Sequence, residues 1–371
     1  MKRYQLDENT VHVYSMTGEH LYRLPYTACQ FTESMKAPGS MSVSVDFSKQ
    51  AQRLQLWKTL HPWKCMIALQ NGEWVRHAGP VTDIQWDAGN RQLQITAGGG
   101  LTLLTKRLVL KSDLNRGWRD GTVIVDEKHP AKNMVMEWRR TWWWVCIVRL
   151  IQETKKWGDL PIDLPTIQEP GDKQRTYYSW DLATVADRIS DIMNLEGGNE
   201  CIFEPYLTED GRLRFNLVIG KPYIVYTRHQ WNAIVPGQRV KLTSISSSGT
   251  NLCTQVWATG GKDSDKTLMC RKTATPKDGY LLMQAANTSH TTVTRLATLQ
   301  QHAKAQLSAG YYPTESFTLE VGEEHAVTVG DEADLRVNDD YLGNQLLKLR
   351  ITDIQGDTNS DWLTLTAVER G

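Results

Sequence analysis

The chain has 371 residues, and its 42 basic side chains are balanced by 42 acidic ones. This length allows two or three domains, and the balanced charge disfavours a dedicated nucleic-acid-binding protein, which usually carries a basic excess. The most apolar stretch, Trp142 to Ile151, is too short for a transmembrane helix, and the N-terminus lacks the apolar run of a signal peptide. We therefore expect a protein that is made in the cytoplasm and makes no stable membrane insertion.

Residues 1–118 are typical of an antiparallel β-unit. Residues 41–45 alternate apolar and polar side chains after the turn residues Pro38-Gly39. Residues 47–59 are predicted to form a short helix with Ser48 as its N-cap. A strand over residues 63–69 then leads into Asn71-Gly72, which favours a hairpin turn.

Residues 119–235 have a different composition, which predicts a small α+β insert domain. Leu182, Val185, Ile189 and Ile192 recur at helical spacing and predict a helix from residue 179 to residue 195, which Gly197-Gly198 would end. Residues 202–206 and 213–219 flank a turn and predict a β-hairpin.

Residues 236–371 are predicted to return to β-structure. Strand-like segments cover residues 241–246, 254–259, 317–321 and 334–337. Between them, residues 291–309 have a helical apolar stripe that ends before Gly310. The order is therefore a β-unit, an α+β insert and a second β-unit with an inserted helix.

The sequence also repeats itself. Val81 to Ala97 reads VTDIQWDAGNRQLQITA, and 270 positions later Ile351 to Ala367 reads ITDIQGDTNSDWLTLTA. Without a gap, 8 of these 17 positions are identical. Each segment reads as a strand, a polar turn and a second alternating strand, so the sequence predicts one β-domain that is present twice.

None of the short motifs supports catalysis or a metal site. Gly98-Gly99-Gly100 and Gly260-Gly261-Lys262 lack phosphate-loop spacing, and the nine histidines form no zinc-binding pair. Ser246-Ser247-Ser248-Gly249 is no nucleophile elbow, and the acidic pairs Glu323-Glu324 and Asp339-Asp340 lie in polar turns. The six cysteines form no CxxC pair, so we expect reduced structural thiols. We expect no catalytic residue, no bound metal and no cofactor, and hence not an enzyme.

The most unusual local feature is Arg139-Arg140 followed by Trp142, Trp143 and Trp144. Such a group can stack on sugar or single-stranded nucleic acid. Adjacent residues of a strand point to opposite faces, however, and cannot form one stacking platform. We favour a strand whose tryptophans fill a core on one face and form a subunit interface on the other.

The order of these elements resembles the hub proteins of tailed-phage tail tips, also called minor tail or tail-associated proteins. The resemblance is carried by four short stretches: Phe31 with Pro38 to Val45, His77 to Ile84, Leu103 to Arg107, and Ile202 to Tyr206 with Asp210 to Leu213. In that family each subunit has two β-barrels that resemble the tail tube. The resemblance thus implies a β-dominated α+β fold with two tail-tube-like antiparallel β-barrel domains, residues 1–118 and 236–371, around the insert at residues 119–235.

The resemblance also implies a function. Three subunits of such hub proteins close a pseudo-hexameric ring at the distal end of the tail tube. The implied partners are the distal tail protein ring, the tape-measure protein and fibre or spike proteins, and DNA passes through the lumen without specific binding. The implied location is the virion tail tip after assembly in the host cytoplasm. Many relatives carry a C-terminal wall hydrolase, and because this chain ends soon after the repeat we expect none here.

Two other functions remain open from the sequence. A carbohydrate-binding or receptor-binding tail protein would use the tryptophans as sugar platforms, which requires exposed and coplanar rings. A cell-wall hydrolase would require a clustered acid/base or metal site, which the sequence does not show.

Overall fold

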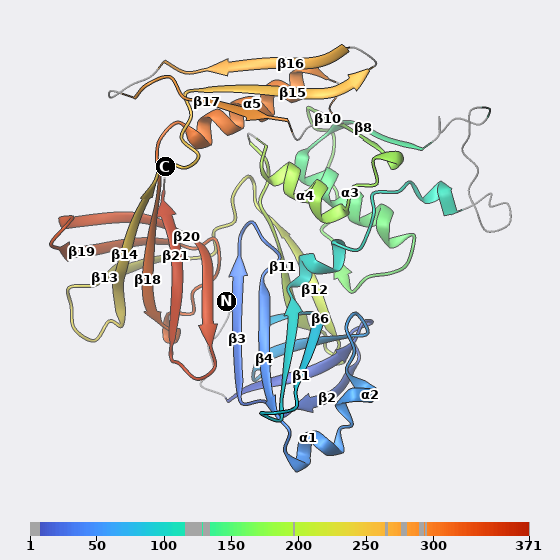
Figure 1. Cartoon of the computed structure of the whole chain (residues 1–371), viewed down its shortest axis with the longest axis vertical. Coiled ribbons are helices and arrows are strands. Elements are labelled where there is room, and N and C mark those ends of the chain that lie inside the picture. The colour runs from blue at the N-terminus through green and yellow to red at the C-terminus, as the bar shows by residue number, and fades with distance from the viewer. Residues whose placement is uncertain are drawn as a thin grey trace.

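The computed structural model describes residues 8–115, 128, 134–195, 197–263, 266–275, 280–288, 293 and 295–370. Within these ranges the fold is dominated by β-strands, as predicted. Thirteen strands share one large sheet, and three small sheets hold the other strands. Figure 1 shows a first β-unit in blue and cyan, a mostly green insert, a module in orange and a second β-unit that is mostly red.

The first β-unit is a series of antiparallel strands with short helices between them. Its elements are β1 (Asn9–Ser15), β2 (His20–Leu24), β3 (Ala28–Ser34), β4 (Ser40–Asp46), α1 (Lys49–Arg53), α2 (Leu56–Thr59), β5 (Cys65–Asn71), β6 (Trp74–Asp87), β7 (Gln92–Gly98), η1 (Gly100–Leu104) and η2 (Ser112–Asn115). In β4, Met41, Val43 and Val45 are buried and the serines between them face the other side of the sheet. The alternation predicted from the sequence is confirmed.

Two short helices occupy residues 47–59, so the single helix expected there is wrong. Ser48 caps α1 as predicted, because its Oγ accepts a hydrogen bond from the backbone N–H of Ala51 (3.3 Å). Gln55 then adopts a left-handed backbone (φ 47°), which interrupts the helix before α2. The interruption turns Leu56 into the core and leaves Trp57 72% exposed.

The insert lies against the first β-unit. Its elements are β8 (Val135–Thr141), α3 (Trp143–Lys155), β9 (Ile162–Asp163), β10 (Lys173–Tyr178), η3 (Ser179–Asp181), α4 (Val185–Met193), β11 (Cys201–Leu207) and β12 (Leu213–Ile219). Strands β11 and β12 form the predicted hairpin. The apolar core of the insert also takes in Tyr14, Met66 and Ala68 of the first β-unit, so the two parts pack as one body.

Residues 142–144 do not lie in a strand, which corrects the expectation from the sequence. Trp142 has an extended backbone and is the N-cap of α3, and Trp143 and Trp144 begin the helix. Helix α3 is buried on most sides, including Val145, Ile147 and Ile151. A helix that is apolar all round reads like a buried strand over a few residues, so periodicity alone did not separate the two.

The helix expected over residues 179–195 is shorter than predicted. Helix α4 begins at Val185, because the Thr184 side chain caps it by accepting a hydrogen bond from the Asp187 N–H (3.1 Å). Val185, Ile189 and Ile192 are buried as predicted. Leu182 lies before the cap, has φ 50° and is 61% exposed, so it is not on the apolar face of a helix.

The second β-unit contains the other six strands of the large sheet. Its elements are β13 (Arg228–Asn232), β14 (Val240–Ser248), β18 (Thr314–Gly322), η4 (Glu323–His325), β19 (Glu332–Asp339), β20 (Gly343–Asp357) and β21 (Trp362–Glu369). Strand β13 pairs in parallel with β19, and the other pairings within this unit are antiparallel.

A separate module lies between β14 and β18, and it occupies the top of Figure 1. It consists of β15 (Gln255–Asp263), β16 (Lys266–Thr273), β17 (Gln284–Asn287) and α5 (Leu296–Gly310). Its small core, which includes Val256, Leu299 and Ala303, is distinct from the core of the large sheet. The helix predicted over residues 291–309 begins at residue 296 in the structure. Residues 291, 292 and 294 lie outside the described residues.

The two closed barrels expected from the resemblance are not formed by the described strands. The large sheet is an open path, β14-β18-β21-β20-β3-β4-β7-β6-β5-β1-β2, with β19 pairing β20 and β13 pairing β19. Strand β3 pairs with β20 of the second β-unit, so it cannot close the first unit on itself. One sheet and one apolar core thus run through both units.

Candidate assembly surface

The same five-stranded arrangement occurs twice in the large sheet. Strands β3, β4, β7, β6 and β5, here called copy 1, pair in the same antiparallel order as β14, β18, β21, β20 and β19, here called copy 2. The repeated segments of the sequence, residues 81–97 and 351–367, occupy the same hairpin in each copy. The predicted repeat of sequence is therefore also a repeat of structure.

Each of these hairpins contains the same irregularity. Thr82 in β6 and Thr352 in β20 are the extra residues of a β-bulge. The Thr82 hydroxyl donates to the carbonyl of Thr96 (3.3 Å), and the Thr352 hydroxyl donates to the carbonyl of Thr366 (3.2 Å). Both threonine pairs are separated by the same 270 positions. The bulges bend both strands at the same point, where each leaves one neighbour for another.

A further part of the repeat escaped the sequence comparison. Residues 40–46 of β4 read SMSVSVD, and residues 316–322 of β18 read SFTLEVG. Met41 stands opposite Ala97, and Phe317 stands opposite Ala367, so the two strands hold equivalent places. Their separation is 276 positions instead of 270. A shift of six positions therefore separates this similarity from the gap-free alignment of residues 81–97 with 351–367.

The copies differ at two connections. Helices α1 and α2 lie between β4 and β5, whereas only η4 lies between β18 and β19. The larger difference is at the other connection. Copy 1 joins β3 to β4 through a short turn at residues 35–39, whereas copy 2 carries the whole module between β14 and β18. The module therefore replaces a turn and leaves the strand pairing of copy 2 unchanged.

One face of the shared sheet is covered by polar side chains. Alternation and strand register place these residues on the face opposite the core: Gln30, Thr32, Ser34, Ser40, Ser42, Ser44, Asp46, Asp83, Gln85, Asp87, Gln92, Gln94, Thr96, Lys241, Ser244, Ser246, Ser248, Ser316, Thr318, Glu320, Asp353, Gln355, Asp357, Trp362, Thr364, Thr366 and Val368. Hydroxyl, amide and carboxyl groups dominate this polar face.

The charge of the polar face is negative. Its described cations are paired with carboxylates: Lys241 pairs with Glu320 (3.3 Å), and Arg350, which stands opposite Val368, pairs with Glu200 (2.5 Å). Lys241 and Arg239 lie over the Trp362 ring (4.2 and 4.8 Å), and Arg239 pairs with Glu324 (3.2 Å). Hydrogen bonds from Asn90 hold the pKa of the Asp87 carboxyl below its usual range, so this group is charged at neutral pH. A polyanion would find repulsion and few cations on this face.

A buried ion pair ties the insert to copy 2. The Arg350 guanidinium donates to both oxygens of the Glu200 carboxylate (2.6 and 2.5 Å). The backbone of Ile224 completes the cluster, because its N–H donates to Glu200 (2.9 Å) and its carbonyl accepts from Arg350 (3.1 Å). The side chains of Arg350 and Glu200 are only 16% and 11% exposed. The cluster fixes the end of the insert against β20.

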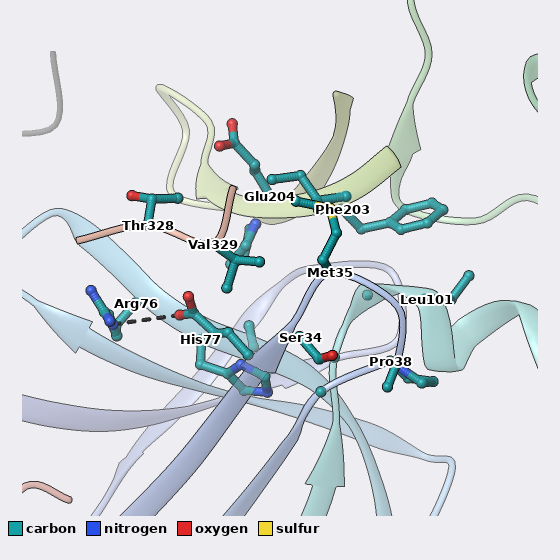
Figure 2. Close-up of a pocket in the computed structure, with 18 of the residues that line it drawn as sticks. Ser34, Met35, Pro38, Arg76, His77, Leu101, Phe203, Glu204, Thr328 and Val329 are labelled. Atoms are coloured by element: carbon teal, nitrogen blue, oxygen red, sulfur yellow. Dashed lines mark ion pairs between the residues drawn. The ribbon is translucent and has the colours of Figure 1, made fainter. Parts of the chain in front are cut away.

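A pocket lies where the first β-unit, the insert and the loop before β19 meet (Figure 2). Its empty volume is about 730 Å³, part of which is open to solvent. In its wall Arg76 pairs with Glu33 (Nε to Oε1, 3.4 Å), and the buried His77 ring stacks beside Phe31. Burial lowers the pKa of His77, so this imidazole is neutral at neutral pH. The pocket walls thus join three parts of the chain and hold a neutral ring and an internally paired charge.

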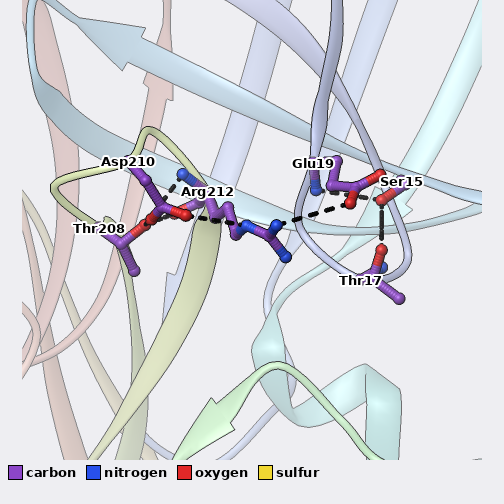
Figure 3. Close-up of polar contacts among 6 residues, drawn as sticks. All are labelled: Ser15, Thr17, Glu19, Thr208, Asp210 and Arg212. Atoms are coloured by element: carbon purple, nitrogen blue, oxygen red, sulfur yellow. Dashed lines mark hydrogen bonds and ion pairs between the residues drawn. The ribbon is translucent and has the colours of Figure 1, made fainter.

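Polar contacts hold the insert on the turn between β1 and β2 (Figure 3). At the tip of the β11–β12 hairpin, Arg212 pairs with Asp210 (3.0 Å) and with Glu19 of that turn (3.7 Å). The Leu213 N–H donates to the carbonyl of Gly18 (2.8 Å). Gly18 has φ 91°, and a Cβ there would overlap the Leu213 carbonyl, so the contact requires glycine. The hairpin is held in one place on the first β-unit.

The three tryptophans predicted as an interface are separated by the fold. Trp143 and Trp144 are 6% and 8% exposed and lie in the core of the insert. Trp142 is 40% exposed. An interface role for these residues stays a prediction, and Trp142 is the member that a partner could reach.

The alternative functions gain no specific support among the described residues. The exposed tryptophans Trp57, Trp86, Trp142 and Trp180 lie on separate elements, α2, β6, the start of α3 and η3. No group of three or more potential metal ligands is found in the described part of the chain. No helix there is long and apolar enough to cross a membrane.

Comparison with solved structures finds phage tail proteins. A tail protein from Neisseria meningitidis MC58 has a TM-score of 0.58 and 13% identity, covering 98% of this chain and 97% of that chain. The 43 kDa tail protein of prophage MuSo2 from Shewanella oneidensis has a TM-score of 0.55 and 11% identity, with coverages of 97% and 98%. Prophage tail protein gp18 from Listeria monocytogenes EGD-e has a TM-score of 0.52 and 12% identity, with coverages of 97% and 94%.

The chain therefore has the fold of these phage tail proteins along nearly its whole length. The resemblance predicted from the sequence is confirmed at the level of the fold. No family model and no curated protein sequence matches the chain.

Proposed function

We propose that this chain is a structural protein of a phage-type tail and forms the hub at the tail tip. The fold shared with phage tail proteins supports its place in a tail. The observation that carries the hub function is the presence of copy 1 and copy 2 side by side in one sheet. Three such chains present six similar units, so a trimer can match a six-fold tube to a three-fold structure beyond it.

In this proposal the trimer is a pseudo-hexameric ring that closes the distal end of the tail tube. Its neighbours are the distal tail protein ring and the tape-measure protein on one side and fibre or spike proteins on the other. The open sheets of single chains become a continuous wall when the ring closes, which removes their free edges. Tail-tube-like domains at residues 1–118 and 236–371 and an insert at residues 119–235 remain part of the proposal, except that β13, which pairs with β19, belongs to the second domain.

The polar face of the shared sheet is proposed as the wall of the channel. Its serine, threonine, glutamine and acidic side chains offer a DNA duplex few cations to bind, since Lys241 is already paired with Glu320 and Arg350 with Glu200. Counterion release, the main source of non-specific affinity for DNA, is therefore absent, and DNA can pass without being held. The role is mechanical, not enzymatic: the ring adapts symmetry, closes the tube and transmits receptor binding.

The mass of the assembled complex tests this proposal. Native mass spectrometry of the purified chain is expected to show a trimer, and electron microscopy is expected to show a ring with six similar units in three repeats. A ring built from six identical chains would contradict the proposal, because it would contain twelve units.

A further inference from the structure

The two copies meet inside the chain at a contact that we call the internal seam. Residues 353–357 of β20 pair antiparallel with residues 30–34 of β3. On the core side of this seam the Phe31 ring covers Gly356, where any Cβ would overlap the ring. The seam is thus closed by a backbone ladder and by a large side chain packed over a glycine.

Each half of the internal seam has an unused counterpart. Strand β14 is the counterpart of β3, and residues 83–87 of β6 are the counterpart of residues 353–357. Among the described strands, β14 pairs only with β18, and residues 83–87 pair only with β7. Trp86, on one of these edges, is 45% exposed. Unpaired edges of this kind associate with other strands unless they are protected.

We infer that residues 83–87 of one chain pair antiparallel with β14 of a neighbouring copy of the same chain, in the register of the internal seam. This contact, the neighbour seam, rests on the proposed trimer and names the strands that close it. Ser246 faces Ser316 as Thr32 faces Ser40, so Ser246 takes the place of Thr32. The expected pairs are Asp83 with Ser248, Ile84 with Ser247, Gln85 with Ser246, Trp86 with Ile245 and Asp87 with Ser244.

The chemistry of the polar face is the same in both seams. In the internal seam Asp353 stands opposite Ser34, Gln355 opposite Thr32 and Asp357 opposite Gln30. Gln30 donates a hydrogen bond to Asp357 (2.9 Å). The neighbour seam likewise sets two carboxylates and one amide against hydrogen-bond donors, which here are the hydroxyls of three serines. No like charges face each other, so cross-strand pairs favour this register.

On the core face, the two seams place the larger side chain on opposite strands. The internal seam has Gly356 on one strand and Phe31 on the other. The neighbour seam has the large residue, Trp86, at the place of the glycine and the smaller Ile245 at the place of the phenylalanine. Ile245 already packs against the main core, and Trp86 already contacts Phe47 (ring centroids 5.0 Å). The pair would cover apolar surface that is exposed in the single chain.

Each chain has one free edge at β14 and one at residues 83–87. Every neighbour seam therefore joins residues 83–87 of one chain to β14 of the next chain. Such head-to-tail contacts form closed rings when the rotation between chains is right. In a trimer three internal seams would alternate with three neighbour seams, and no edge of either kind would remain free.

Disulfide cross-linking tests the register. A chain with Gln85→Cys and Ser246→Cys is expected to give covalent trimers on non-reducing gels after mild oxidation, because directly opposite residues lie about 4.5–5.5 Å apart between Cα atoms. The matched control carries Thr32→Cys and Gln355→Cys, the equivalent pair of the internal seam, and is expected to form its bond within one chain. A chain with Gln85→Cys and Ser248→Cys, shifted by two residues, is expected to cross-link poorly.

The possible outcomes separate the two proposals. A native trimer without the covalent bands, alongside an oxidised internal control, would overturn the neighbour seam and leave the trimer standing. Efficient linkage of the shifted pair would overturn the register. A purified chain that gives neither trimer nor intermolecular bands would count against both proposals.

A second variant tests the neighbour seam without added cysteines. Trp86→Asp places a charge on the apolar side of the seam and is expected to convert trimers to monomers while the chain stays folded. Trp57→Asp, at a tryptophan that is 72% exposed on α2, is the control and is expected to leave the trimer intact. Trimers of unchanged stability in Trp86→Asp would contradict the inference.

Discussion

At the scale of single residues, the Arg350–Glu200 pair is a buried polar link between the insert and copy 2. Arg350→Met would leave the Glu200 carboxylate buried without its counter-charge, which typically costs about 3–5 kcal/mol. Chemical denaturation is expected to show a loss of this size in the free energy of unfolding. The control is Arg139→Met, which breaks an exposed pair with Glu137 and is expected to change the free energy of unfolding far less. Similar losses in the two variants would contradict this account.

His12 predicts how stability depends on pH. Burial, with smaller contributions from His20 and Arg23, lowers the pKa of His12 from 6.5 to about 4. Between these values the unfolded chain binds a proton that the folded chain does not, so stability rises with pH and is lost on acidification. His12→Gln is expected to flatten the stability profile between pH 6.5 and 4, measured by denaturation at each pH. A profile parallel to that of the unaltered chain would refute the role of His12.

Residue patterns in the sequence predicted some of these features and missed others for a physical reason. The alternation in β4 placed Met41, Val43 and Val45 in the core, because a period of two is a local property of a strand. The ion pair joins residues 150 positions apart, and no local pattern reports such a distance. The helical start at Trp143 was missed because the first six residues of α3 are all apolar and buried, so no polar position marks the helical period before Arg149.

At the scale of elements, the module can be tested as a replaceable turn. Deleting residues 249–313 and joining Ser248 to Thr314 through Asn-Gly would give copy 2 a short β14–β18 hairpin like the β3–β4 hairpin of copy 1. The large sheet is expected to stay folded, because the module core is separate from the main core.

Hydrogen exchange measures this expectation through the protection of β18, β20 and β21. Protection in these strands is expected to match that of the intact chain. Loss of protection across the large sheet would show that the module supports copy 2 and does not merely replace a turn.

The repeat also shows how far elements can be predicted from sequence. Its hairpin was found because residues 81–97 and 351–367 align without a gap. The sequence did not predict the pairing of β3 with β20, because the residues within a strand do not identify a pairing partner more than 300 positions away. That pairing replaces the closed barrels expected from the resemblance with a shared open sheet.

At the scale of the whole molecule, the polar face predicts that the chain does not bind DNA. Gln94→Lys with Thr364→Lys adds cations at equivalent places on the face in the two copies. This variant is expected to bind duplex DNA with an affinity that falls as salt rises, whereas the unaltered chain is expected to show no binding. Fluorescence anisotropy over a series of salt concentrations measures the difference.

The control for this experiment adds the same charge elsewhere. Asn90→Lys with Asn359→Lys places the lysines in the hairpin turns of the two copies, off the polar face. Tight DNA binding by the unaltered chain, or equal binding by the two variants, would argue against the polar face as a channel wall.

The module has a consequence for any assembly of these chains. Because only copy 2 carries it, a trimer would have three modules, each set between two unadorned turns of copy 1. The rim that bears these connections would therefore repeat at 120°, while the strands beneath it repeat at close to 60°. The opposite rim would carry α1 and α2 in copy 1 and η4 in copy 2, so a docking protein would meet different elements at the two ends of the assembly.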